Sequence, residues 1–207
     1  MKHLNHVLFI LSVLAAPLAA ASNLDQNESG SVGVYLSYDG PVSDRALDAM
    51  VQEVEELIHP AGFQLHWRLL DRRRSDESFS NLVVVTLHGK CSMADTEEGS
   101  HPGLVGDDLV LGSTRVSDGQ ILPFSDVECD RIRRSIAALA AGNSPAAKEW
   151  LLGRAMGRVL AHELFHVFGN TFKHGHEGVA KTSFSPRELV ADRFKFAVKD
   201  AGLMERH

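Results

Sequence analysis

Two histidines and a glutamate lie close together in the segment His162-Glu163-Leu164-Phe165-His166. On an α-helix, residues four apart share one face, so the two imidazoles can reach a single metal ion. Glu163 points to one side of that pair, where its carboxylate can hold a water without binding the metal. Such spacing is typical of helices that bind Zn²⁺ through two histidines and use the glutamate as a general base. We therefore predict that His162 and His166 bind zinc and that Glu163 is catalytic.

The residues around this segment carry the signals of a long buried helix. Ser144 and Pro145 suit the N-cap and the first turn, and Gly169 suits the end. Apolar residues lie nearly all round the helix between these positions, as expected inside a core; they are Trp150, Leu151, Ala155, Val159, Leu160, Leu164, Val167 and Phe168. The alternative is a buried helix in which the two histidines only form hydrogen bonds.

The third metal ligand must come from outside this helix. A catalytic zinc site usually has three protein ligands and keeps one position for water. In the longer pattern H-E-x-x-H-x-x-G-x-x-H the third ligand would fall on residue 172, which is Phe172 here. Other donors follow at His174, His176 and Glu188. His174 is favoured because a chain that ends its helix at Gly169 can turn back within a few residues.

Residues 162–190 resemble small secreted bacterial zincins, distant metzincins with the pattern H-E-x-G-H-x-x-x-G-x-x-x-H-x-x-x-G-I-M. The matching positions are His162, Glu163, His166, His174 on the third histidine and Gly178-Val179 on the Gly-Ile. The resemblance implies a zincin-like fold, a bound Zn²⁺ with His174 as the third ligand, and peptidase activity. Phe165 replaces the helix glycine of that pattern, and Ala180 replaces the methionine that forms an apolar floor beneath the zinc.

A second resemblance leads to a different third ligand. The run Glu188-Leu-Val-Ala-Asp192 is similar to the E-x-x-A-D helix of gluzincins, in which the glutamate binds zinc and the aspartate supports a ligand histidine. An amphipathic C-terminal helix with ordinary surface acids would contain the same residues. We expect His174 to be the third ligand, with Glu188 and His176 as alternatives.

The first residues have the features of a secretory signal peptide. Lys2 precedes an apolar run from Val7 to Ala21 that closes in Ala19-Ala20-Ala21-Ser22, as in an n-region, an h-region and an A-x-A cleavage site. An uncleaved membrane anchor is the alternative, but the run is short for a bilayer span and contains Pro17. We predict a signal peptide over residues 1–21, one domain over residues 22–207, and a secreted or periplasmic protein that is free of the membrane after cleavage.

Charge and cysteine content limit the partners and the compartment. The formal net charge is −6, which argues against nucleic acid or an anionic membrane as a partner. Cys91 and Cys129 are the two cysteines of the chain. They can pair in an oxidising compartment or remain separate thiols, because the sequence does not show whether their geometry permits a bond.

The remaining pattern predicts strand, helix, strands, helix and active-site helix in that order. The predicted strands are residues 31–38, 63–69, 82–87, 109–111 and 120–124, with 82–87 in the middle of the sheet and Pro123 on an edge. One predicted helix begins after the N-cap Ser43. A second spans residues 130–141, with Ile132, Ile136 and Leu139 inward. This order predicts an α+β fold, a zincin-like single domain in which a twisted mixed sheet packs on the active-site helix.

Together these patterns predict a zinc-dependent peptidase with a peptide or protein substrate. Such an enzyme needs a second electrophile opposite the zinc, and Tyr35, Tyr38 and His176 are candidates. Two other classes fit the same residues. One is a zinc hydrolase of non-peptide amides such as cell-wall cross-links, and the other is a secreted module that binds zinc without catalysis.

Overall fold

The computed structural model describes residues 30–73, 76–94 and 110–204. Its strands are β1 (Ser31–Tyr38), β2 (Gln64–Leu69), β3 (Asn81–His88), β4 (Gly112–Ser117) and β5 (Gln120–Glu128). They form one five-stranded sheet of order β2-β1-β3-β5-β4, in which only β4 runs antiparallel to its neighbour. The prediction is thereby confirmed at the level of a single mixed α/β domain. The predicted signal peptide lies outside the described residues.

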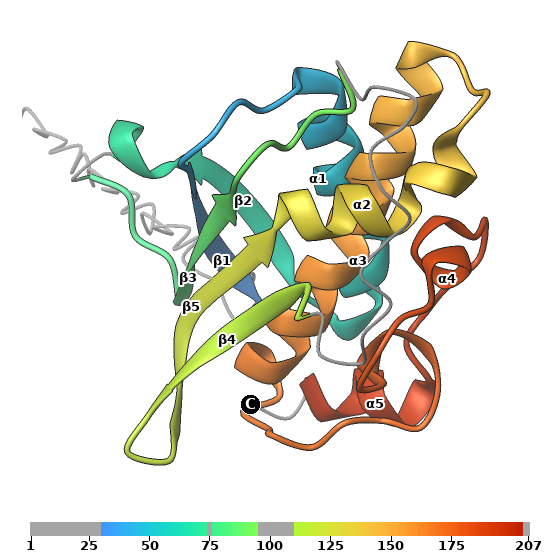
Figure 1. Ribbon diagram of the computed structural model, residues 1–207. Helices are drawn as coiled ribbons and strands as arrows, with labels where there is room; N and C mark the ends of the chain where they lie inside the picture. Colours follow the sequence, from blue (N-terminus) through green and yellow to red (C-terminus); the bar gives the residue numbers. More distant parts are fainter. Residues whose placement is uncertain (1–29, 74–75, 95–109, 205–207) are drawn as a thin grey trace, which may run out of the picture.

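Helices pack against one face of this sheet (Figure 1). They are α1 (Asp44–Ile58), α2 (Cys129–Ala140) and α3 (Pro145–Phe168). The shorter helices α4 (Pro186–Val190) and α5 (Val198–Met204) follow near the C-terminus, and α4 contacts α2 and α3 rather than the sheet. α1 lies between β1 and β2 in the sequence, so it provides the crossover that two parallel strands require. No helix in the described part of the chain is both long and apolar enough to cross a bilayer.

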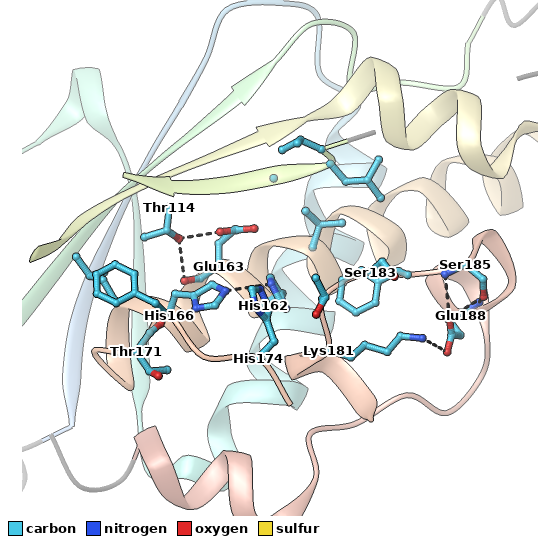
Figure 2. Close-up of a pocket in the computed structure, with 18 of the residues that line it drawn as sticks. Thr114, His162, Glu163, His166, Thr171, His174, Lys181, Ser183, Ser185 and Glu188 are labelled. Atoms are coloured by element: carbon cyan, nitrogen blue, oxygen red, sulfur yellow. Dashed lines mark hydrogen bonds and ion pairs between the residues drawn. The ribbon is translucent and has the colours of Figure 1, made fainter. Parts of the chain in front are cut away.

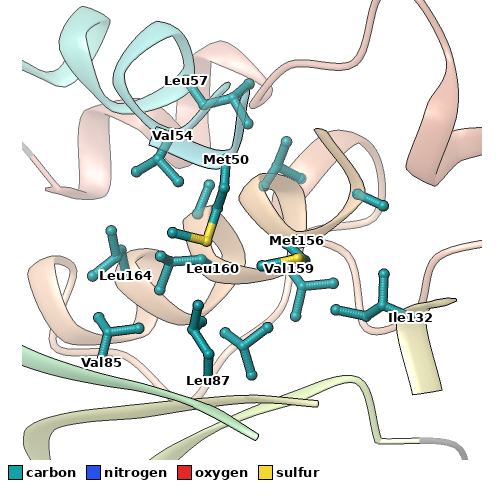
Figure 3. Close-up of a cluster of buried hydrophobic side chains, with 14 of the residues drawn as sticks. Met50, Val54, Leu57, Val85, Leu87, Ile132, Met156, Val159, Leu160 and Leu164 are labelled. Atoms are coloured by element: carbon teal, nitrogen blue, oxygen red, sulfur yellow. The ribbon is translucent and has the colours of Figure 1, made fainter. Parts of the chain in front are cut away.

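The core lies between the sheet and helices α1 and α3 (Figure 3). β3 is the central strand, as predicted, and its alternate residues Val83, Val85 and Leu87 are fully buried. α1 begins after Ser43, whose side chain accepts a hydrogen bond from Ala46 N, a favourable N-cap. The apolar run of β3 and the N-cap of α1 are local signals, and both elements therefore lie where the sequence predicts them.

The region from residue 110 to 128 differs from its prediction. A strand was expected over residues 109–111; residue 109 lies outside the described residues, and residues 110–111 are not in a strand. Instead β4 spans Gly112–Ser117 and forms a hairpin with a longer β5. Pro123 was expected on an edge strand, yet β5 is an inner strand. Pro123 is tolerated there because the β3 pairing begins only at Phe124 and the β4 pairing is irregular opposite it.

The inner face of α2 also differs from its prediction in one residue. Ile132 and Ile136 are fully buried, as expected, but Leu139 is 38% exposed. Residues four apart share a face of a helix, so the inward stripe continues from Ile136 to Ala140, which is buried. Around the helix axis Leu139 lies about 60° from Ile136 and about 100° from Ala140, on the side that faces solvent.

A disulfide links Cys91, just after β3, to Cys129 at the start of α2. Its Cα atoms are 4.9 Å apart, within the usual range for such a bond, and both residues are fully buried. The sequence left open whether these cysteines pair. The two cysteines are 38 residues apart in the sequence, and the β4–β5 hairpin lies between them. The bond therefore links the ends of the segment that carries this hairpin.

Candidate metal centre

Helix α3 brings the three residues of the H-E-x-x-H segment to one place. It begins after Ser144, whose side chain accepts a hydrogen bond from Ala147 N, and it ends at Phe168. His162, Glu163 and His166 are 7%, 5% and 9% exposed. The two imidazoles lie four residues apart and meet edge-on, with their Nε2 atoms 3.1 Å apart.

Backbone carbonyls fix the tautomers of both histidines. His162 Nδ1 lies 2.7 Å from the carbonyl oxygen of Val179, and His166 Nδ1 lies 2.7 Å from that of Thr171. A carbonyl oxygen only accepts hydrogen bonds, so each Nδ1 carries the proton and donates it. In the neutral imidazoles both Nε2 atoms then present lone pairs to the same point. This arrangement is repulsive by itself and is suited to a cation between the two rings.

Burial also keeps these imidazoles neutral. It lowers the pKa of His162 to about 4, and it lowers the pKa of His166 as well, because a charged ring loses its hydration inside the protein. Neutral imidazole is the form that binds a metal. The donor atoms are therefore in the protonation state that a metal ion requires at neutral pH.

His174 completes a group of three histidines. One nitrogen from each of His162, His166 and His174 lies within 4.8 Å of the others. The His174 ring stacks on His162 and meets His166 edge-on. Among the described residues this group can hold a metal ion, and three imidazoles with a free fourth position are one of the ligand sets of catalytic zinc. The residues predicted as ligands are thus brought together, although the identity of the ion is not fixed by their arrangement.

The alternative ligand Glu188 points elsewhere. One carboxylate oxygen contacts Lys181 Nζ, and the other accepts hydrogen bonds from Ser185 N and Ser185 Oγ in a capping box at the start of α4. The hydrogen bond from Lys181 is the main reason why the pKa of Glu188 falls to about 2. Asp192 is solvent-exposed and contacts Arg154 rather than a histidine, so the geometry expected of a gluzincin helix is not formed.

A cavity of about 950 Å³ opens over these residues (Figure 2). His162, Glu163, His166 and His174 all line it. One wall is apolar and comes from β4, β5 and the residues before them, including Val110, Leu111, Val116 and Ile121. Another wall comes from the segment Lys181–Ser185 together with Glu188, and it is polar except for Phe184. Phe172, which occupies the position of the third histidine in the pattern H-E-x-x-H-x-x-G-x-x-H, is 55% exposed and also lines this cavity.

The residues proposed from the sequence as second electrophiles do not reach the cavity. Tyr35 packs edge-on against Phe79, Tyr38 is 46% exposed at the end of β1, and neither they nor His176 line the cavity. Lys181 is the cationic side chain of the polar wall, and it is already paired with Glu188.

Glu163 has the electrostatic environment of a proton-transfer group. Burial raises the pKa of its carboxyl to about 7, and a hydrogen bond from Thr114 offsets part of that rise. A carboxyl with a pKa near the working pH can both accept and release a proton. Thr114 was not among the residues singled out from the sequence, because it lies in the strand that was predicted at the wrong place.

No protein-family model matches this chain, and no curated protein matches it either. The fold and the site define a mixed α/β domain with a three-histidine group that can hold a metal ion beside a carboxylate, at the base of a large cavity.

His174→Ala should weaken metal binding far more than Glu188→Ala. Loss of residues that merely orient a ligand typically costs about 10–100-fold in metal affinity, so loss of a ligand itself should exceed about 100-fold. Glu188→Ala should leave the affinity close to that of the wild type, because Glu188 bonds to Lys181 and Ser185. Competition with a chromophoric zinc chelator measures both affinities. A larger loss in Glu188→Ala would show that Glu188 is the ligand.

Proposed function

We propose that this protein is a secreted zinc-dependent peptidase in which His162, His166 and His174 hold the metal and Glu163 is the general base. The observation that carries the proposal is the buried Glu163 carboxylate beside three converging imidazoles in one large cavity. The zincin-like character of the fold is part of this proposal. It is supported by the mixed sheet that packs on the helix carrying both the base and two of the histidines.

The donor set fits Zn²⁺ because it consists of three neutral nitrogen ligands. A bound Zn²⁺ would supply a water that ionises near neutral pH and would polarise the carbonyl of the scissile bond. Glu163 holds the attacking water, accepts its proton and then delivers that proton to the leaving amine. Its pKa of about 7 suits both steps. Val179 and Thr171 keep the ligand nitrogens unprotonated through their carbonyl oxygens.

Export from the cytoplasm is part of the same proposal. Structural disulfides persist mainly in oxidising compartments, and the pair Cys91–Cys129 is fully buried. This agrees with the expectation that residues 1–21 are a signal peptide. The substrate is expected to be a peptide or protein, for which the cavity offers one apolar and one polar wall.

Digestion of a broad peptide library tests the proposal. Zinc-loaded protein should cleave peptide bonds, a chelator should abolish the cleavage, and added Zn²⁺ should restore it. Purified peptidoglycan fragments are assayed in parallel. Cleavage of those fragments alone would replace the peptidase by a hydrolase of cell-wall amides. Full zinc occupancy without hydrolysis of any substrate would show a zinc-binding module instead.

A further inference from the structure

A threonine from the edge strand contacts the carboxylate of the proposed base. Thr114 Oγ1 lies 2.8 Å from Glu163 Oε2 and 3.1 Å from the main-chain oxygen of Glu163 (Figure 2). Behind it, Ser125 of β5 is paired with Thr114 across the hairpin, and the two hydroxyl oxygens are 3.4 Å apart. Ser125 is 1% exposed. Two side chains of the hairpin thus form a short polar chain that ends on Glu163.

The backbone of β4 is built to approach α3 at this point. A Cβ atom on Gly112 would lie 2.6 Å from Val159 Cγ1 and 3.0 Å from Glu163 Oε1, so only glycine allows this spacing without movement of the neighbours. Side chains two residues apart in a strand point to the same face. The close approach at Gly112 therefore directs the Thr114 hydroxyl onto Glu163, two residues further along.

We propose that Thr114 is a positioning residue that holds the Glu163 carboxylate by one oxygen and leaves the other for the attacking water. The inference rests on the proposed function of the site. Glu163 Oε2 is taken by Thr114, whereas Oε1 makes no hydrogen bond among the described residues, and Glu163 lines the cavity. Without this contact the flexible glutamate side chain would have to be ordered in each cycle, at a cost in side-chain entropy.

A hydroxyl is suited to this role because it is both a donor and an acceptor. When Glu163 is ionised, Thr114 donates its proton to Oε2. The same hydroxyl oxygen lies 3.1 Å from the main-chain oxygen of Glu163, so Thr114 is held against the helix backbone as well as against the carboxylate.

Two substitutions test the role of the hydroxyl separately from that of the side-chain volume. Thr114→Val has the same shape without a hydroxyl, and Thr114→Ser keeps the hydroxyl. Thr114→Val should lower kcat by about 10–100-fold, the range found for residues that orient a group at a metal site, with KM and zinc content unchanged. Thr114→Ser should recover most of kcat. Ser113→Ala, an exposed neighbour in β4, is the control for disturbance of the hairpin and should behave as the wild type.

Several results would overturn the inference. One is full kcat in Thr114→Val, and another is a Thr114→Ser variant that is no more active than Thr114→Val. A third is a joint fall of kcat, zinc content and thermal stability in Thr114→Val, as for a purely structural contact. If the wild type hydrolyses nothing, the proposed function fails, and crystal structures still decide the positioning role. Glu163 should occupy one rotamer in the wild type and Thr114→Ser, and should leave it in Thr114→Val. An unchanged Glu163 in Thr114→Val would refute the role.

Discussion

Glu163→Gln should lower kcat/KM for peptide hydrolysis by about 10²–10⁴-fold, the usual contribution of a general base. An amide has nearly the same shape as a carboxylate but cannot accept the proton of the attacking water. The metal should stay bound, because the ligands are the histidines and not Glu163. The fold should be kept, since a glutamine side chain can still accept the hydrogen bond from Thr114.

Steady-state kinetics together with zinc analysis of the same samples measure this effect. Glu177→Gln is the matched control, because Glu177 lies in the loop beside the site, is exposed and does not line the cavity. It should retain the wild-type rate. A Glu163→Gln variant that keeps its rate with full zinc would remove Glu163 from the mechanism.

Glu53→Gln should destabilise the protein by about 3–5 kcal/mol, as expected when one partner of a buried charge group is removed. Glu53 of α1 lies between two arginines of α3. Its carboxylate is 2.7 Å from Arg158 Nε and 3.6 Å from Arg154 Nε. The Arg158 side chain is 1% exposed, so its charge would remain inside the protein with carbonyl oxygens as partners but without a carboxylate. Burial already lowers the pKa of Arg158, against the effect of Glu53.

The same arginine joins the core to the wall of the cavity. Arg158 donates hydrogen bonds to the carbonyl oxygens of Glu188 and Ala191, at the end of α4. Urea unfolding of Glu53→Gln measures the loss of stability. Glu56→Gln, an exposed residue on the same helix, is the control and should change the free energy of unfolding by less than about 0.5 kcal/mol. Equal stabilities of the two variants would show that the buried charge group contributes nothing.

Local signals allowed much of this fold to be predicted from the sequence. The starts of α1 and α3 follow from Ser43, Ser144 and Pro145, because caps act within one turn of the chain. The position of β3 follows from its apolar run. The H-E-x-x-H spacing could place two imidazoles on one face because helix geometry is fixed over four residues. The position of His174 was harder to predict, because it depends on the loop after α3 turning back toward that face of the helix.

The β4–β5 hairpin had a signal that the prediction did not use. Asp118 and Gly119 both have positive φ, 51° and 75°, as the central residues of a type I′ turn do. An Asp-Gly pair between two strands is a strong hairpin signal. The register, however, depends on an irregularity between Thr114 and Val116. No local pattern in the sequence marks that shift, so the contact of Thr114 with Glu163 could not be predicted.

Tertiary contacts explain the other differences. Arg158 is a charged residue on a helix that looked apolar nearly all round, and it is fully buried because Glu53 and two carbonyl groups surround it. Glu188 matched a ligand pattern, but Lys181 lies seven residues earlier in the chain and takes its carboxylate. In both cases the residue that pairs with the charged side chain comes from another segment of the chain. Sequence spacing alone does not determine which segments come into contact.

Zinc analysis of the purified mature protein by mass spectrometry tests the central claim most directly. After reconstitution and removal of loose metal, the wild type should hold about one Zn²⁺ per chain. The double variant His162→Ala/His166→Ala should hold none while its circular dichroism spectrum stays that of the wild type. His66→Ala, whose ring stacks on Phe79, should retain the full amount. A wild type without bound zinc, or a double variant that holds as much as the wild type, would contradict the account.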